Sequence, residues 1–296
     1  MNNTASVRAQ ASAGFGLIEL MISMVLGLIV LGAAIAVFQS NQRSYSSNEG
    51  LSRVQEGARV AYEMMSRDIR AAGSSACTSE GLVMGTDANS VAFRAPITGT
   101  ATPAQLTTRA AADQSYRVQS ATANSVTLVA ITGFTPSDVF EADDVVMVCN
   151  GSMVGFATVG SVSGNQINFS NPLAFDPADT ERAAAGSIAI AQFRNTRWSV
   201  AANSRSTVNS LYVSRNGGAN EEVADGVQSL GLSYRQNGGG GNATTYVAAP
   251  GDFQYVDGVR LVFPVRTPAP REVGAATDAW VTRNASTTVS VRSRTL

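Results

Sequence analysis

An uninterrupted apolar run near the N-terminus constrains the fold of this chain more than any other feature. Residues 15–38 read FGLIELMISMVLGLIVLGAAIAVF, and Glu19 is their only ionisable side chain. At about 1.5 Å per residue, a helix of this length spans roughly 36 Å, more than the ~30 Å hydrocarbon core of a bilayer. The run therefore predicts one membrane-spanning helix. The alternative is a secretory signal peptide cleaved near Gly32-Ala33-Ala34.

The helical pattern continues past this run, which favours the membrane helix over the signal peptide. No proline or turn cluster interrupts the chain after Phe38, and Gly73 with Ser74 and Ser75 marks a plausible end. Apolar residues recur at steps of three and four: Leu51, Val54, Ala58, Ala61, Tyr62, Met65, Ile69 and Ala72. We therefore expect one helix over residues 15–72, with its second half docked on the following domain. Two pairs spaced i, i+4, Glu49–Arg53 and Glu63–Arg67, would support it.

Beyond residue 73 the pattern changes to that of short strands. Val259, Leu261, Phe263 and Val265 alternate with residues on the other face, which is typical of a half-buried antiparallel sheet. The candidate strands are 90–94, 125–131, 144–149, 153–159, 166–169, 187–194, 211–214, 227–235, 259–266 and 287–292. Residues 95–115 and the glycine-rich 237–242 are predicted loops. The predicted fold class is α+β, a long N-terminal helix packed on a C-terminal antiparallel β-sheet domain.

Composition excludes most common enzyme classes. The 296 residues include 21 arginines but no lysine and no histidine, and the formal net charge is −1. The chain cannot form a Ser-His-Asp triad, a His-ligated zinc site, a Schiff base or a lysine-bearing P-loop. Its near-zero charge argues against nucleic-acid binding by bulk electrostatics. We expect no catalytic residues, no cofactor and no metal.

One alternative from another class stays open, a membrane-anchored enzyme or ligand-binding module, because carboxylate or serine chemistry is not strictly excluded. The acidic cluster Glu141, Asp143 and Asp144 is the nearest approach to a metal site. It lacks the alternating ligand spacing and the glycine of a known calcium loop. We interpret it as a solvated turn before a strand, and the sequence does not decide whether it binds a metal.

Glu19 is the first candidate functional residue. A carboxylate inside a membrane helix costs a few kcal/mol on insertion scales and is a functional candidate by default. If the chain is cut after Gly14, the new α-amino group of Phe15 is a cation that Glu19 of the same or a neighbouring chain can meet. The alternative is that Glu19 lies at the membrane interface and reaches water.

Cys77 and Cys149 are the only cysteines. With a membrane helix before them, both should lie outside the cytoplasm, where disulfides persist. A bridge between them would contribute roughly 3–4.5 kcal/mol in the chain-entropy model. Two free buried thiols are the alternative.

The N-terminal motif leads to a family. Gly14-Phe15-Gly16-Leu17-Ile18-Glu19-Leu20 resembles the class III signal of type IV pilins and pseudopilins. The resemblance implies that prepilin peptidase cuts between Gly14 and Phe15 and N-methylates Phe15, and that Glu19 supports filament assembly. Gly16 stands where threonine or serine is commonest, and the leader carries one basic residue, Arg8.

The resemblance also divides the chain into segments. Residues 1–14 would be the leader peptide, 15–38 the transmembrane and filament-core helix, 39–73 the amphipathic helix that continues into the globular domain, and 74–296 a periplasmic β-rich domain. The protein would be a single-pass inner-membrane protein that becomes extracellular in the assembled pilus.

Weaker matches point to PilW-type minor pilins. They are Arg67–Gly73 followed by Cys77, Ala142–Cys149, Val223–Leu230 with Tyr234, Val259-Arg260-Leu261 and Val291–Arg294. The resemblance implies a minor pilin that primes type IV pilus assembly near the tip. Its partners would be other minor pilins, the major pilin, prepilin peptidase and a tip adhesin. The J-type minor pseudopilin of a type II secretion system is the alternative.

Overall fold

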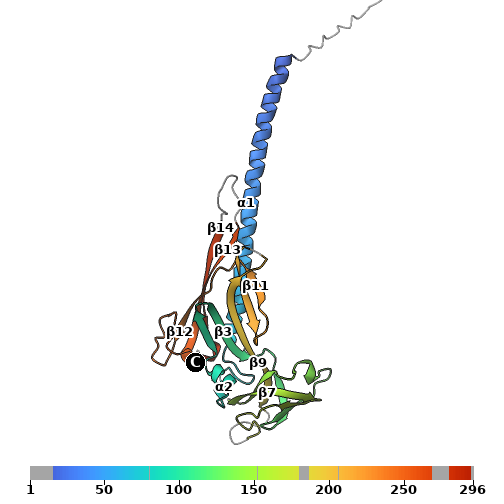
Figure 1. Cartoon of the computed structure of the whole chain (residues 1–296), viewed down its shortest axis with the longest axis vertical. Helices are drawn as coiled ribbons and strands as arrows, with labels where there is room; N and C mark the ends of the chain where they lie inside the picture. The colour runs from blue at the N-terminus through green and yellow to red at the C-terminus, as the bar shows by residue number, and fades with distance from the viewer. Residues whose placement is uncertain are drawn as a thin grey trace, which may run out of the picture.

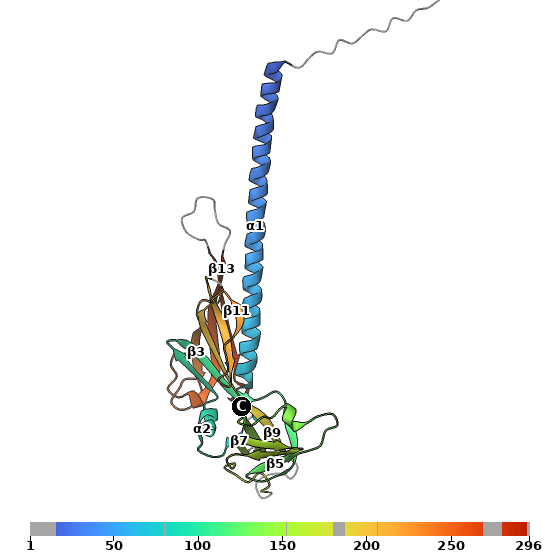
Figure 2. The same ribbon diagram turned by 45° about the vertical axis from the view of Figure 1, so that its right-hand side comes forward.

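A single long helix dominates the computed structural model, which describes residues 16–79, 81–151, 153–179, 187–205, 207–268 and 280–294. Helix α1 (Leu17–Ala71) is 55 residues long. Its N-terminal half extends away from the rest of the molecule, and its C-terminal half lies along the β-rich part (Figures 1 and 2). The predicted fold class is confirmed.

The strands and short helices follow α1 in chain order. They are β1 (Leu82–Val83), α2 (Ala88–Arg94), β2 (Ile97–Ala101), β3 (Ala104–Ala111), β4 (Tyr116–Ala121), β5 (Ser125–Leu128), η1 (Pro136–Asp138), β6 (Val145–Asn150), β7 (Met153–Ser163), β8 (Gln166–Phe169), β9 (Ile188–Ala202), β10 (Asn209–Arg215), β11 (Glu221–Asp225), β12 (Gly231–Gln236), η2 (Phe253–Tyr255), β13 (Val256–Pro268), β14 (Trp280–Ser290) and η3 (Arg292–Arg294).

Strand β9 connects the two parts of the larger sheet. This sheet has eleven strands, and β9 pairs with β3, β4, β6 and β10 within it. The first residues of β9 pair with β4 and β6, and the later ones pair with β3 and β10. The 15-residue strand therefore runs from the far end of the molecule toward the helix. Apart from the short parallel pair β1–β7, the named strand pairs are antiparallel.

The smaller sheet has the strand order β12–β13–β14 and packs against α1. Val259, Leu261, Phe263 and Val265 of β13 are all buried, as their alternation predicts. They share one core with the helix stripe, in which Ala61, Met65, Ile69 and Ala72 have no exposed surface. A second core, formed mainly by β4–β8, lies at the end remote from the free half of α1.

Two predictions about residues 90–115 are wrong. Residues 90–94 form part of helix α2, because the Asp87 side chain caps it by accepting from the N–H groups of Asn89 and Ser90, both at 3.0 Å. Residues 95–115 are not a loop, since they contain strands β2 and β3. Threonine favours strands, but the glycine and alanine residues between the threonines do not, and the pairing of β3 with β2 and β9 supplies the context that fixes both strands.

The other candidate strands coincide with observed ones, with shifted ends. The largest shifts are at β9, which runs eight residues beyond the predicted end at 194, and at β14, which begins seven residues before the predicted start at 287. At 227–235, Val227 makes only an isolated bridge to Val265, and β12 begins at Gly231. The glycine-rich residues 237–242 lie in the connection between the paired strands β12 and β13, as predicted.

Candidate functional site

The N-terminal half of α1 is an apolar surface on which no other described residue packs. Every residue over 17–38 is exposed. The first, Leu17, is 81% exposed, and the last, Phe38, is 62% exposed. Among the described residues, α1 is the one helix long and apolar enough to cross a membrane. Burying an apolar side chain of this size is worth about 1.5–3 kcal/mol. This half of α1 therefore needs lipid or other protein chains around it.

Glu19 lies in the first turn of this helix, and its side chain is exposed. Its N–H donates to the Gly16 carbonyl at 3.0 Å. No cation pairs with its carboxylate in the described part of the chain. The helix dipole favours a negative charge at this end, and an apolar environment opposes it. Gly14 and Phe15, the predicted processing and methylation sites, lie outside the described residues.

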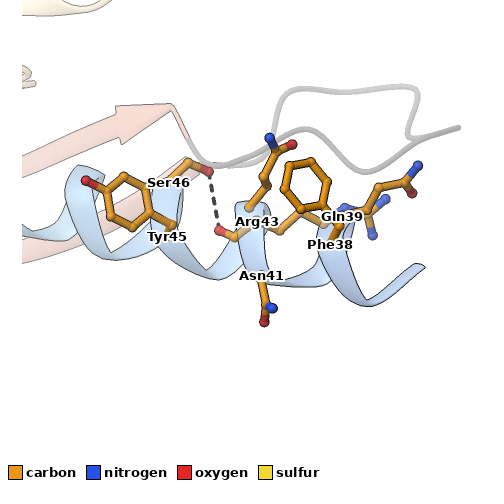
Figure 3. Close-up of a pocket in the computed structure, with 7 residues that line it drawn as sticks. Phe38, Gln39, Asn41, Arg43, Tyr45 and Ser46 are labelled. Atoms are coloured by element: carbon orange, nitrogen blue, oxygen red, sulfur yellow. Dashed lines mark hydrogen bonds between the residues drawn. The ribbon is translucent and has the colours of Figure 1, made fainter. Parts of the chain in front are cut away.

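Polar side chains mark the end of the apolar run. Phe38, Gln39, Asn41, Arg43, Tyr45 and Ser46 line a shallow hollow on the helix surface (Figure 3). The Ser46 hydroxyl donates to the Arg43 carbonyl at 3.3 Å. Aromatic and arginine side chains are suited to a membrane–water boundary, because each has an apolar body and a polar tip. If α1 crosses a membrane, the span ends in this segment.

Ion pairs along the second half of α1 follow the prediction only in part. Arg53 pairs with Glu49 at 2.7 Å, as expected. Glu63 instead pairs with Arg59, at 2.8 Å, and Arg67 reaches Asp113 of the β-rich domain at 2.9 Å. The predicted Glu63–Arg67 pair is wrong because Asp113, distant in sequence, competes for Arg67.

The C-terminal end of α1 is held by the end of the chain. Gly73, with φ +79°, donates its N–H to the Arg109 carbonyl at 2.8 Å. The buried Ser293 hydroxyl donates to the Ala72 carbonyl at 2.8 Å. A Cβ added at Gly73 would collide with the Ser293 hydroxyl and meet Pro96 Cγ at 3.2 Å. Gly73, Ser293 and Arg109 form what we term the helix-end clamp.

Replacing Gly73 with alanine should lower the free energy of unfolding by about 3 kcal/mol, the sum of a left-handed backbone cost and overpacking. Gly133 is a matched control, because its φ is +78° but a Cβ there would meet nothing within 4 Å. Gly133→Ala should cost about 1 kcal/mol. Urea unfolding of both variants measures the difference. Equal losses would mean that the clamp contributes nothing beyond backbone conformation.

Asp68, one turn before the end of α1, is a shielded carboxylate. Its Oδ2 accepts from the Trp198 indole N–H at 3.0 Å, and its Oδ1 lies 3.7 Å from Arg194. Trp198 is fully buried. Burial raises the pKa of Asp68 above 3.8, against the opposing effects of Arg194, Trp198 and Arg215 and with a further rise from Asp113. The sequence patterns do not predict a role for Asp68, whose one signal is that it is a lone carboxylate next to Ile69 of the apolar stripe.

This raised pKa makes stability depend on pH. Between pH 3.8 and the higher folded-state pKa, the folded protein binds more protons at Asp68 than the unfolded chain does. The Asp68 contribution to stability is therefore largest below pH 3.8 and falls as the pH rises through this window. The free energy of unfolding of the wild type, relative to that of Asp68→Asn, should decrease between about pH 3.5 and about pH 7, a range that brackets such a pKa shift. Urea midpoints measured across this range test the prediction. A difference that grows with pH would contradict this assignment.

The two cysteines form the predicted disulfide. Cys77 and Cys149 are bonded, with their Cα atoms 6.0 Å apart and a sequence separation of 72. Cys149 is buried on β6, and Cys77 follows the helix-end clamp. The bond links the exit of the helix to strand β6.

The acidic residues before β6 form a turn. The Asp144 carboxylate accepts from the Glu141 N–H and from the Gln192 amide, both at 3.0 Å, and Asp143 has φ 73°. Within the described residues, no three His, Cys, Asp or Glu side chains are grouped to hold a metal ion.

One comparison with known proteins gives a match. Residues 10–35 match the prokaryotic N-terminal methylation motif. This range contains the peptide bond between Gly14 and Phe15, the Glu19 carboxylate and most of the exposed apolar run. Neither the curated proteins nor the solved structures include a match to the chain.

Proposed function

We propose that this type IV pilin-like protein, a substrate of prepilin peptidase, is a PilW-type minor pilin that primes pilus assembly and sits at or near the pilus tip. One observation carries the proposal: a methylation motif opens a helix whose apolar half is fully exposed and whose other half is fixed to a large β-rich domain. After cleavage at Gly14 and methylation of Phe15, residues 15–38 would anchor the protein in the inner membrane. The domain after residue 73 would lie in the periplasm.

In this proposal one apolar surface serves two environments. Lipid surrounds residues 15–38 before assembly, and neighbouring pilin helices surround them afterwards. The exchange costs little, because lipid tails and apolar side chains are similar surroundings for such a helix. Glu19 and the α-amino group of Phe15 would neutralise each other between adjacent subunits and so set the axial offset of their helices.

The positions of the PilW-like segments support the finer assignment. Arg67–Gly73 ends α1, and Val291–Arg294 carries Ser293, which bonds to Ala72. Ala142–Cys149 contributes the disulfide to Cys77. Segments that match weakly one by one thus meet at the helix end, where a shared fold would require them. Other minor pilins, the major pilin and a tip adhesin are the proposed partners.

Mass spectrometry of the protein from its native membrane tests this proposal. We expect a chain that begins at N-methyl-Phe15 and is lighter than the dithiol form by one pair of hydrogens. A chain that begins at Met1 would remove the support for a filament role, and cleavage after the apolar run would indicate a secreted protein. Affinity purification of the processed form then separates the alternatives: pilins indicate the proposed role, and type II secretion components indicate a J-type pseudopilin.

A further inference from the structure

A small pocket next to the helix-end clamp combines segments from five parts of the chain. Its volume is about 180 Å³, and Gly73, Phe93, Arg94, Gln254, Ser293 and Arg294 are among its lining residues. They belong to the end of α1, to α2, to η2 and to η3, and β1 completes the wall. No acidic side chain from the described part of the chain lines it. We call this cavity the arginine pocket.

The two arginines of this pocket bond only to carbonyl oxygens among the described residues. Arg94 Nη2 donates to the Gly85 carbonyl at 2.7 Å, and Arg294 Nη2 donates to the Arg94 carbonyl at 3.0 Å. Neither forms an ion pair with a described carboxylate. A guanidinium has five N–H donors, so most of the donors of both residues remain for another ligand.

Two other shielded arginines have carboxylate partners, whereas Arg109 bonds to the Ala95 carbonyl and the Thr98 hydroxyl. Arg235 donates to both oxygens of Asp257 at 2.8 and 3.1 Å, and Arg194 contacts Asp68 and Asp113. Two positive charges that share a partly buried pocket repel each other and lose hydration. An anion between Arg94 and Arg294 would remove this repulsion and accept paired N–H donors in the planar arrangement that guanidinium groups favour.

We propose that the arginine pocket binds one small oxyanion, a carboxylate or a phosphate, between Arg94 and Arg294. Its volume is below the roughly 300–1,000 Å³ of pockets for drug-sized ligands, so a single acid group fits it better than a nucleotide. The acid group has two possible sources, a free ion or the terminal carboxylate of another chain. Because Gly73 and Ser293 also line the pocket, the anion stabilises the attachment of α1. This proposal does not depend on the filament role.

Thermal unfolding of the full-length protein in detergent tests the proposal. Phosphate or acetate in the millimolar range, at an ionic strength matched with chloride, should raise the Tm of the wild type by about 2–5 °C with saturation. Arg94→Gln and Arg294→Gln should lose this increment. Arg117→Gln is the matched control, because Arg117 is an exposed arginine of β4 that does not line the pocket, and it should keep the increment.

The variants separate specific binding from the general stabilisation that phosphate gives most proteins. Equal increments in the wild type, Arg94→Gln and Arg294→Gln would overturn the proposal, as would no increment in the wild type. If Arg294→Gln does not fold, Arg294→Lys keeps the charge without the planar donors and should need at least about threefold more anion for half of the effect.

A pair of tripeptides identifies the source of the acid group. A peptide with a free C-terminus that acts at lower concentration than acetate, while its amidated form does not act, would indicate a chain end. A response to phosphate that exceeds the response to either peptide would indicate a free ion. Inactivity of all of these ligands would contradict the proposed site.

Discussion

Replacing Glu19 with alanine should reduce incorporation of the protein into filaments at least tenfold, while processing and membrane insertion persist. A charge-assisted bond between a carboxylate and an amine contributes about 1.5–3 kcal/mol, and each 1.4 kcal/mol corresponds to about a tenfold change in an equilibrium. In the apolar surroundings of residues 15–38 no other group can replace this carboxylate, because residues 20–38 carry no charge. The measurement is the amount of protein in sheared filaments relative to the amount in the membrane.

Glu56→Ala is the matched control for this experiment. Glu56 is an exposed acid on the same helix without an ion pair to any described residue, so its loss should leave incorporation unchanged. Glu19→Gln should resemble Glu19→Ala, because it removes the charge and keeps the size. Normal incorporation of Glu19→Ala would contradict the proposed role, and failure of the control would mean that the assay reports general damage to α1.

Removing the disulfide should produce the largest loss of stability. Opening a loop of this length raises the chain entropy of the unfolded state, worth about 4 kcal/mol in the chain-entropy model. For a domain of this size that loss should lower the Tm by about 10 °C. The double variant Cys77→Ser, Cys149→Ser isolates the effect, and differential scanning calorimetry measures it.

Reduced wild-type protein is the reference for the same bond. The two single cysteine variants and the reduced protein should unfold near the temperature of the double variant. Glu19→Ala should unfold at the wild-type temperature, because Glu19 is exposed in the first turn of α1, whose N-terminal half extends away from the β-rich part. A double variant as stable as the oxidised wild type would mean that folding contacts alone hold the helix exit on β6.

The long helix could be predicted from sequence because its signals are local and repeated. The apolar run, the stripe from Val54 to Ala72 and the stop at Gly73 all depend on neighbours within a few turns. The strands with alternating Val, Leu and Phe residues could be predicted for the same reason. Strands β2 and β3 could not, since β2 pairs with β3 and β3 pairs with residues of β9 that lie more than eighty positions later in the chain.

The candidate site divides in the same way. Glu19 and the methylation motif are visible as residue types at fixed spacing. The bond from Ser293 to Ala72 spans 221 residues of sequence, and the bond from Trp198 to Asp68 spans 130. No local sequence pattern predicts partners at such separations. The disulfide could be predicted despite the long sequence separation of its cysteines, because the chain has no other cysteine.

The attachment of α1 has a mechanical consequence. At about 1.5 Å per residue the helix is a rod of roughly 80 Å that is gripped along its C-terminal third and at its very end. A force along the helix axis therefore places the whole contact between α1 and strands β13 and β14 in shear. The helix-end clamp and the disulfide hold the C-terminal end of the helix in place under this force. Shear of a long interface breaks many contacts together, whereas peeling would break them one after another. In a filament of the kind proposed above, force along the filament axis should therefore leave this helix attached to its own domain.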